Sequence, residues 1–355
     1  MSRRGAVAAA VAGLLVAGSV VTALSVGAGR AARLAGRPPA EVVAPEDARP
    51  VPELTGITEW FNAPPLTMAG LRGRVVLLDV WTYSCVNCRR TFPFLRALHE
   101  TYADRGLTVI GVHSPEFDFE KSPDNVERAV RDLDVTWAVA NDPDRAMWDA
   151  LRNSYWPAKY LVDRHGRIRL VHVGEGDEAE IEDAVRGLLA DGGDPGAARA
   201  GAKHEPPRGK QTPELYLGYL RGGLVREGVT EDRADPPRRD RVRLAGRFTG
   251  AEEYVTAAAP GATVTVDYTA RDVYAVLAPP AGSTARQRVE VRWNDAPVPP
   301  DRRGAAVVAR EGRTYVDVRT DDLYHLLTAP APGEGRVTLV ATAPGVRFFT
   351  FTFGR

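Results

Sequence analysis

The fold is decided by residues 75–90, which read VVLLDVWTYSCVNCRR. The run Val75–Val80 is apolar and rich in β-branched residues, and this composition predicts a strand that is buried on both faces. The apolar run breaks at Thr82–Ser84 and is followed by apolar residues at helical spacing. Cys85 and Cys88 therefore lie where a strand passes into the N-terminus of a helix.

Cys85 and Cys88 are the only two cysteines among the 355 residues. Unpaired backbone N–H groups and the helix dipole stabilise an anion at a helix N-terminus, so the Cys85 thiol should ionise more readily than a free cysteine. A Cys85 thiolate can attack a disulfide, and Cys88 can then resolve the mixed disulfide. We therefore expect a redox-active disulfide between Cys85 and Cys88 and no other cofactor.

Two other uses of this cysteine pair remain open at this point. The pair would supply half of a zinc site, but the chain has no second Cys-x-x-Cys motif and its six histidines are scattered singly. A structural disulfide across so short a loop would remove little chain entropy. The pattern therefore favours redox chemistry and predicts no metal site.

Trp81 and the two cysteines, preceded by a strand that contains an aspartate, form a pattern that resembles the thioredoxin superfamily. The sequence from Asp79 to Arg90 is most similar to the TlpA-like branch, in particular to the extracytoplasmic part of DipZ-type proteins. Upstream residues that carry the same likeness are Trp60, Asn62, Pro65, Leu66 and the run Leu71–Leu77. The resemblance implies a thioredoxin-like α/β fold here and thiol–disulfide oxidoreductase activity.

Asp79 interrupts the apolar strand six residues before Cys85. A carboxyl group buried there should have a raised pKa and can pass a proton to or from Cys88, and the thioredoxin fold places such an acid beneath the cysteines. Pro157 resembles the cis-proline that faces the cysteines in this superfamily and leaves neighbouring backbone free to pair with a substrate. A solvated aspartate and an ordinary strand-edge proline are the alternatives. Thr91 stands where several reductive TlpA-like proteins carry a glutamate, which leaves Asp79 as the main acid–base candidate.

Aromatic residues near the motif are the other candidates for substrate contact. Trp81 and Tyr83 would shape the rim beside the nucleophile and Trp156 would line the substrate groove, although core packing explains all three equally well. Glu116 follows a strand end from which it could approach the cysteines, but a solvated loop acid is the simpler interpretation. His113 is likewise interpreted as a polar loop residue.

The composition and the N-terminus bear on the location of the protein. Equal numbers of basic and acidic residues, 46 of each, give no field that would attract nucleic acid. Residues 5–29 contain no charged residue and follow two arginines, so residues 1–29 are predicted to be a transmembrane anchor or a cleaved signal peptide. Residues 30–52 are Pro-rich and are predicted to be a linker. We therefore expect a membrane-anchored or secreted protein on the extracytoplasmic face.

Strands and helices alternate over residues 53–191, which predicts a parallel or mixed sheet with helices on both faces. After the first strand, we expect strands at Leu107–Val112, at Val135–Ala140, after Pro157 and at Arg167–Val173, and helices at Ser122–Leu133, Asp144–Arg152 and Glu178–Leu189. Residues 192–212 are rich in Gly, Pro and Ala and have no apolar period, so they are predicted to be a second linker.

Residues 213–355 contain short β-rich runs separated by turns. The runs are Val242–Phe248, Ala262–Tyr268, Val273–Leu277, Arg288–Trp293, Ala305–Ala309, Thr314–Arg319, Val337–Ala341 and Val346–Phe353. This spacing predicts an all-β sandwich or jelly roll. The segments Thr212–Gly218 and Phe351–Gly354 resemble the C-terminal module of DipZ-type proteins, whose fold is similar to galactose-binding-like domains. A glycan is therefore a candidate ligand, with Trp293, Tyr254 and Tyr274 as stacking platforms, although aromatic residues on strands more often belong to the core.

The expected function is that of an extracytoplasmic thiol–disulfide oxidoreductase that reduces disulfide-containing protein substrates, for example in cytochrome c maturation. The residues between the cysteines carry no positive charge, which favours a reductant over an oxidant. A reductant outside the cell needs electrons from a membrane thiol donor, which the resemblance suggests is CcdA-like. A disulfide-forming oxidase, a metal chaperone and a non-enzymatic binding protein are the alternatives, although copper-delivery members of the superfamily use a CxxxC motif that this chain lacks.

Overall fold

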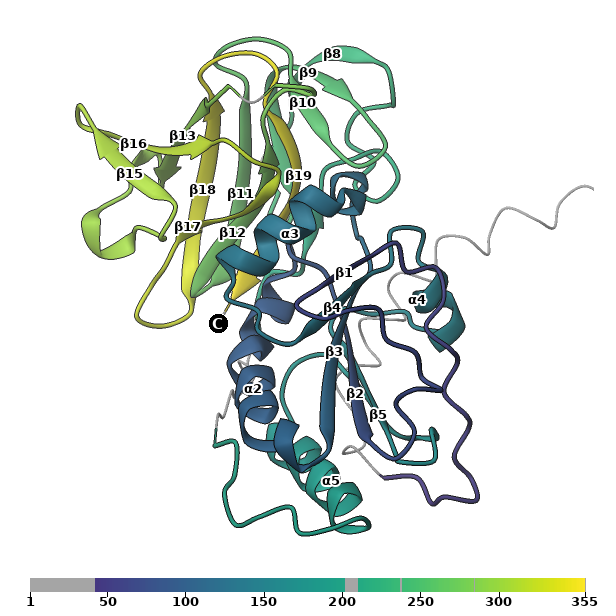
Figure 1. The fold of residues 1–355 in the computed structure, drawn as a ribbon. Coiled ribbons are helices and arrows are strands. Elements are labelled where there is room, and N and C mark those ends of the chain that lie inside the picture. The colour runs from purple at the N-terminus through teal and green to yellow at the C-terminus, as the bar shows by residue number, and fades with distance from the viewer. Residues whose placement is uncertain (1–41, 202–209, 237, 284, 355) are drawn as a thin grey trace, which may run out of the picture. The chain divides into compact units, whose positions relative to one another are not determined.

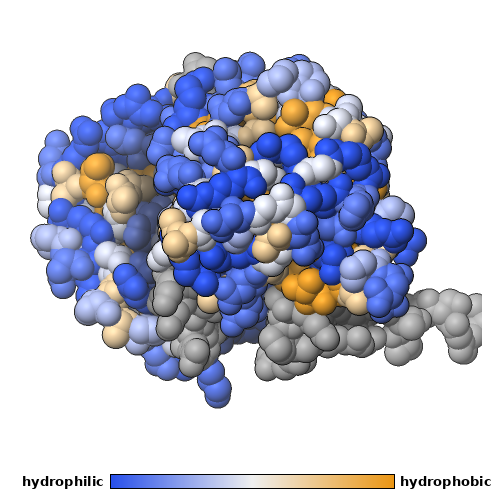
Figure 2. Space-filling model, turned by 60° about the horizontal axis from the view of Figure 1, so that its bottom comes forward, coloured by the Kyte–Doolittle hydropathy of each residue, from blue (hydrophilic) through white to orange (hydrophobic). Residues whose placement is uncertain are grey.

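The computed structural model describes residues 42–201, 210–236, 238–283 and 285–354. The predicted anchor or signal segment, residues 1–29, and the first part of the predicted linker lie outside these ranges. Within the described ranges, no helix is both long enough and apolar enough to cross a membrane. Figure 2 shows a face on which hydrophilic residues predominate and apolar residues form only small patches.

The N-terminal domain is built on a six-stranded mixed sheet in the order β1-β4-β3-β2-β5-β6. Its strands are β1 (Glu59–Phe61), β2 (Val75–Trp81), β3 (Leu107–His113), β4 (Ala138–Asn141), β5 (Ala158–Val162) and β6 (Ile168–Val173). β3 is parallel to both β2 and β4, whereas β1, β5 and β6 pair antiparallel with their neighbours. Every residue of β2 is buried, as its apolar composition predicts for a central strand.

Helices cover both faces of this sheet. They are α2 (Val86–Tyr102), α3 (Pro123–Asp132), α4 (Ala146–Leu151) and α5 (Glu178–Ala190), with a 3₁₀ turn η3 at Asp118–Lys121. Figure 1 shows α2 and α5 on one side of the strands and α4 on the other. The Tyr102 hydroxyl of α2 donates to Glu182 of α5 at 2.6 Å. On the opposite face, Met147 and Leu151 of α4 pack with Leu78 of β2 in one apolar core.

The predicted linkers are partly folded onto the N-terminal domain. The Val43 N–H donates to the Arg169 carbonyl at 2.7 Å and the Val51 N–H donates to the Gly166 carbonyl at 3.0 Å, so this segment runs along β6. Val51 is buried. In the second linker, the Ala200 N–H donates to the Glu182 carboxylate at 2.8 Å. Within the linker predicted over residues 30–52, residues 43–51 therefore contact the domain, because backbone groups of the neighbouring turn and strand pair with them.

The C-terminal domain consists of one antiparallel sheet of thirteen strands. The strands are β7 (Leu215–Tyr216), β8 (Thr230–Ala234), β9 (Val242–Gly250), β10 (Val255–Ala257), β11 (Thr263–Ala270), β12 (Asp272–Ala278), β13 (Gln287–Trp293), β14 (Ala296–Pro297), β15 (Val307–Arg310), β16 (Arg313–Val318), β17 (Asp322–Leu327), β18 (Gly333–Ala341) and β19 (Arg347–Gly354). The sheet curves around a single core that includes Leu244, Phe248 and Phe351. Burial alternates along β11, as the period-2 pattern predicts.

All eight β-rich runs of this half fall on observed strands, but five strands have no counterpart among the predictions. β7, β10 and β14 are only two or three residues long. β8 reads TEDRA and has no apolar residue other than alanine. β17 begins with a polar residue and includes His325, so it lacks the strict alternation of its neighbours. These strands form because adjacent strands offer unpaired backbone groups, which is a tertiary effect.

A further apolar cluster joins the two domains. Its buried members are Val86 and Phe117 from the N-terminal domain and Val276, Ala278, Leu323 and Phe349 from the C-terminal domain. We call this set the interdomain cluster. The Phe349 ring lies 5.2 Å from the Phe117 ring and 4.8 Å from the Tyr254 ring, measured between centroids. Val86 lies between the two cysteines, so the C-terminal domain packs directly on the first turn of α2.

We predict that Phe349→Ala lowers the free energy of unfolding by about 3–5 kcal/mol, because it leaves a cavity in the interdomain cluster. Urea denaturation followed by fluorescence measures this loss. Val308→Ala, at an exposed position of β15, serves as the control and should change the free energy by less than about 0.5 kcal/mol. Equal effects of the two substitutions would show that the cluster contributes little to stability.

Candidate active site

Cys85 is the N-cap residue of α2. Its Sγ accepts a hydrogen bond from the Cys88 backbone N–H at 3.2 Å, and its own N–H donates to the Thr82 carbonyl at 3.3 Å. Sulfur thus takes the place that a serine or aspartate oxygen takes in ordinary helix caps. The Cys85 sulfur therefore lies at the N-terminus of α2, where backbone N–H groups point toward it.

The two cysteines differ in exposure. Cys85 is half-buried, Cys88 is fully buried, and no disulfide joins them in this structure. Burial raises the pKa of the Cys88 thiol well above its usual range, and the hydrogen bond and the charge of Cys85 raise it further. Cys88 therefore stays protonated, whereas Cys85 is accessible from the surface. These are the properties expected of a resolving thiol and of a nucleophile, respectively.

Asp79 lies within the core beneath the cysteines. It is fully buried, and its only charged partner in the described structure is Lys159, whose Nζ lies 3.2 Å from Oδ1. Burial raises the pKa of Asp79, whereas the Lys159 charge lowers it, and burial is the larger effect. The Asp79 charge also contributes to the raised pKa of Cys88, so the two groups are electrostatically linked.

Lys159 was missed by the sequence reasoning. It is directly opposite Asp79 in the antiparallel pairing of β2 with β5 and is only 1% exposed. Its signal in the sequence was a lysine inside the short apolar strand that follows Pro157. That signal identifies a buried cation only when the register of β5 against β2 is known.

Pro157 begins the segment that leads into β5, and the Trp156–Pro157 peptide bond is cis. The Trp156 indole Nε1 donates to the Ser114 carbonyl at 2.9 Å, and its ring lies 4.2 Å from the Trp148 ring. Trp156 is half-buried. It therefore keeps an accessible edge, which a role in the substrate groove requires.

Trp81 and Tyr83 do not form the rim that the sequence analysis assigned to them. Both side chains are fully buried. The Tyr83 ring stacks on the His113 ring at 5.6 Å, and the Trp81 ring meets the same imidazole edge-on at 5.0 Å. Burial raises the pKa of the Tyr83 hydroxyl. The core-packing alternative is the one that the structure supports for this pair.

His113 is a buried strand residue rather than a polar loop residue. It ends β3 with no exposed surface. Burial lowers the pKa of His113 to about 3, so the ring is neutral over the physiological range. The sequence suggested a loop because a serine and a proline follow the histidine.

Glu120 is a second residue that the sequence reasoning missed. This fully buried carboxylate accepts hydrogen bonds from the Ser84 N–H at 3.1 Å and the Ser84 hydroxyl at 2.7 Å. Its other oxygen accepts from the N–H groups of Glu116 at 2.7 Å and Phe117 at 3.0 Å. Glu120 therefore ties the residue before the nucleophile to the turn that contains Glu116. No local sequence pattern predicts the contact between Glu120 and Ser84, because the two residues are 36 positions apart.

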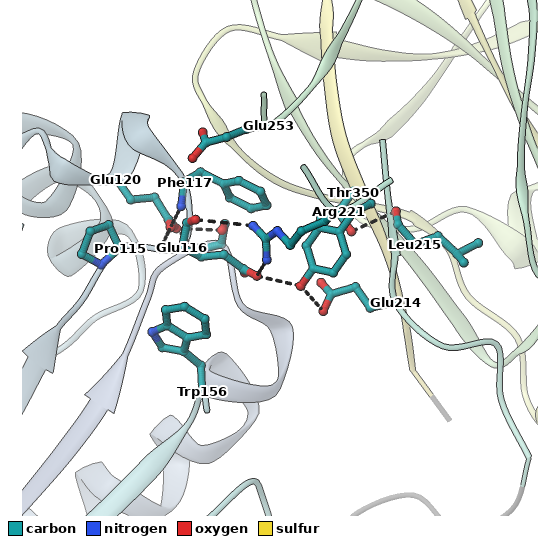
Figure 3. Close-up of polar contacts among 12 residues, drawn as sticks. Pro115, Glu116, Phe117, Glu120, Trp156, Glu214, Leu215, Arg221, Glu253 and Thr350 are labelled. Carbon is teal, nitrogen blue, oxygen red and sulfur yellow. Dashed lines mark hydrogen bonds and ion pairs between the residues drawn. The ribbon is translucent and has the colours of Figure 1, made fainter. Parts of the chain in front are cut away.

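Glu116 is neither a solvated loop acid nor a partner of the cysteines among the described contacts. Its carboxylate accepts hydrogen bonds from the Tyr216 hydroxyl and from Arg221 Nη1, both at 2.7 Å, and the side chain is 8% exposed. Figure 3 shows Glu116 facing Arg221 while Glu120 lies behind the same turn. Both predictions for this residue are therefore corrected: Glu116 connects the two domains.

The candidate glycan platforms are half-buried and already in contact with other side chains. Arg302 lies over the Trp293 ring at 5.4 Å, and the Tyr274 ring stacks on His325 at 4.4 Å. Tyr254 packs against Phe349 in the interdomain cluster. For metal, the described ranges contain no group of three or more His, Cys, Asp or Glu side chains that could hold an ion.

Comparisons with known proteins agree with this geometry. The Redoxin family model matches residues 52–188, and the family model described as "Thioredoxin like C-terminal domain" matches residues 212–354. The Thioredoxin-like protein YneN of Bacillus subtilis is 31% identical over 137 residues, which are 36% of this chain and 78% of YneN. The chain belongs to the thioredoxin superfamily.

Two further relatives match this member of the superfamily. Protein DipZ of Mycobacterium tuberculosis is 33% identical over 330 residues, which cover 87% of this chain and 43% of DipZ. The chain thus spans less than half of the length of that relative. The Thiol-disulfide oxidoreductase YkuV of Bacillus subtilis is 29% identical over 143 residues, which are 40% of this chain and 96% of YkuV.

We predict that the two thiols of this thioredoxin-superfamily protein react very differently with iodoacetamide. In Cys88→Ser, Cys85 should be alkylated readily at pH 7, because it is half-exposed and caps a helix. In Cys85→Ser, Cys88 should resist alkylation in the folded protein, because burial blocks access and raises its pKa. Mass spectrometry of timed samples measures both rates. Similar rates would contradict the assignment of nucleophile and resolving thiol.

His113 should make the protein sensitive to acid. Its pKa of about 3 in the folded state lies below the usual histidine pKa of about 6.5, so the unfolded chain binds the extra proton first as the pH falls. This lowers the free energy of unfolding by up to about 1.4 kcal/mol per pH unit between pH 6.5 and 3. In His113→Gln, denaturant titrations at pH 7, 6 and 5 should show a smaller loss than in wild type. His165→Gln, at an exposed turn, should keep the wild-type slope, and a matching slope in His113→Gln would refute the prediction.

Proposed function

We propose that this protein is an extracytoplasmic protein disulfide reductase that uses the Cys85–Cys88 dithiol. The observation that carries the proposal is the pairing of a half-exposed sulfur at a helix N-cap with a fully buried thiol above Asp79. The names of the relatives support the same chemistry, since YkuV is called a thiol-disulfide oxidoreductase.

The reaction has two exchange steps. The Cys85 thiolate attacks one sulfur of the substrate disulfide, and the other substrate sulfur leaves as a thiolate. Cys88 then loses its proton and attacks Cys85 Sγ, which releases the second substrate sulfur and forms the Cys85–Cys88 disulfide. The substrate gains two electrons from the protein dithiol, and its two sulfur atoms leave as thiolates that take protons from the solvent. Asp79 is the group suited to accept the Cys88 proton, because its pKa is raised and it is electrostatically linked to that thiol.

The electrostatics around Cys85 favour the reducing direction. The nearby cation Arg89 donates to the Tyr83 carbonyl and pairs with Asp322, and Arg90 pairs with Glu175 at 3.5 Å. Each of these arginines is thus paired with a carboxylate, which weakens its stabilisation of a Cys85 thiolate. A strong oxidant stabilises its thiolate, whereas a less stabilised thiolate gives a lower reduction potential.

The location and the partners of the protein are part of the same proposal. The uncharged segment of residues 5–29 and the similarity to DipZ support export with a membrane anchor or a signal peptide. A CcdA-like membrane thiol donor would then return electrons to the dithiol, and cytochrome c maturation would be one use of it. For the C-terminal domain, we propose that the single thirteen-stranded sheet has a jelly-roll, galactose-binding-like topology and a glycan ligand, which the aromatic ring of Trp293 at the edge of the core would help to hold.

The reduction potential tests the proposal. Equilibration of the Cys85–Cys88 couple with glutathione buffers should give a value near −270 mV, the reductant end of the superfamily range, and not near −120 mV. Cys88→Ser should accumulate mixed disulfides on Cys85 in cells, whereas Cys85→Ser should accumulate none. A potential at the oxidising end would indicate a disulfide-forming oxidase instead of a reductase. If Cys88→Ser accumulated no mixed disulfides, both functions would be contradicted.

A further inference from the structure

The C-terminal domain forms part of the surroundings of the nucleophile. Val86, the residue after Cys85, is 5% exposed and packs in the interdomain cluster with Leu323 and Phe349. A pocket of about 250 Å³ lies beside this contact. Its lining residues are Val86, Arg89 and Arg90 from α2, and Tyr274, Leu323 and His325 from the C-terminal domain. The pocket therefore exists only where the two domains meet.

The chemistry of the lining is cationic and aromatic. Two guanidinium groups, an imidazole and a phenol face two aliphatic side chains, and none of the lining residues is acidic. The carboxylates that pair with the arginines, Asp322 and Glu175, are outside the lining. The pocket thus presents N–H donors to anything that enters it.

Both guanidinium groups are held in place and still have donors to spare. Arg89 uses Nε for the Tyr83 carbonyl and Nη2 for Asp322. Arg90 uses Nη1 for the Asn87 side chain at 3.2 Å and for Glu175 at 3.5 Å. A guanidinium carries more N–H donors than these contacts consume, and an arginine held by other groups loses less entropy when it binds a second acceptor.

Gly354 of β19 leaves space for the guanidinium group of Arg90. A Cβ atom at Gly354 would lie 2.2 Å from Arg90 Nη2, so only glycine allows the guanidinium to occupy this position. Arg90 also lies over the Tyr274 ring at 6.0 Å, and Tyr274 stacks on His325 at 4.4 Å. His325 in turn lies 3.3 Å from Asp272 through Nε2. These contacts give the pocket a fixed cationic wall.

We propose that this pocket binds an acidic side chain of the substrate polypeptide, close to the disulfide that Cys85 attacks. A volume of about 250 Å³ is below the usual size of a small-molecule site, roughly 300–1,000 Å³, and suits one side chain. A carboxylate matches the planar fork of a guanidinium. Val86, which lines the pocket, is the residue next to Cys85. A side chain that flanks the substrate cysteine can therefore enter the pocket while the sulfur atom of that cysteine contacts Cys85. The inference rests on the proposed disulfide reductase function. It assigns the C-terminal domain a role in substrate specificity.

The test compares three peptides, each with one internal disulfide, in which the residues on both sides of one cysteine are aspartate, asparagine or lysine. The reduced full chain should reduce the aspartate peptide with the highest kcat/KM. Arg90→Gln should lower the preference for aspartate over asparagine about tenfold, the range of one charge-assisted hydrogen bond. Arg90→Lys, which keeps the charge and loses the fork, should retain part of the preference.

Arg96→Gln is the matched control, because Arg96 is on the same helix and donates to the Leu133 and Asp134 carbonyls outside the pocket. It should keep the full preference. Binding of the same peptides with serine in place of both cysteines, followed by fluorescence anisotropy, tests the pocket without the reaction. Equal binding of the aspartate and asparagine peptides would overturn the pocket assignment. Selective binding without any peptide reduction would support the pocket and overturn the reductase instead.

Discussion

The hydrogen bond from the Cys88 N–H to Cys85 Sγ is the interaction on which the site depends. It exists because β2 is buried along its whole length and ends at Trp81. The chain therefore turns beyond the carboxyl end of this strand, and α2 starts there. The helix then presents unpaired N–H groups to the first cysteine, and its first turn carries the second cysteine into the core. The same geometry leaves Cys85 half-exposed and buries Cys88, and this burial raises the pKa of the Cys88 thiol.

Two buried acids support this arrangement in different ways. Asp79 is paired with Lys159 beneath the cysteines, and loss of one member of such a buried pair typically costs about 3–5 kcal/mol. Glu120 is satisfied by four hydrogen-bond donors instead of a cation. Asp79 therefore carries a raised pKa beside a buried cation, whereas Glu120 holds the loop before Cys85 in place.

The C-terminal domain is joined to the redox site by both apolar and polar contacts. Val86 is buried in the interdomain cluster, and Arg89 pairs with Asp322. On the neighbouring turn, Glu116 accepts hydrogen bonds from Tyr216 and Arg221. Because Glu120 binds the same turn, the residues around Cys85 and the C-terminal domain share one network.

The sequence by itself determined the elements whose signal is local. The apolar run of β2, the Cys-x-x-Cys spacing and the proline at residue 157 identified the strand, the helix start and the redox chemistry, because each depends on neighbours within a few residues. Most strands of the C-terminal domain followed from alternation in the same way. The burial of Asp79 was foreseen because a lone acid interrupts an apolar strand.

Only the tertiary structure decided the partners. Lys159 meets Asp79 through strand register, Glu120 meets Ser84 across 36 residues, and Glu116 meets Arg221 across 105 residues. Trp81 and Tyr83 were predicted to line the rim beside Cys85, but both lie in the core. Residues of β3 and α2 cover them, as the contacts of Trp81 with His113 and Phe92 show. Contacts of this kind depend on where distant segments pack, and no periodicity in one segment encodes the position of another.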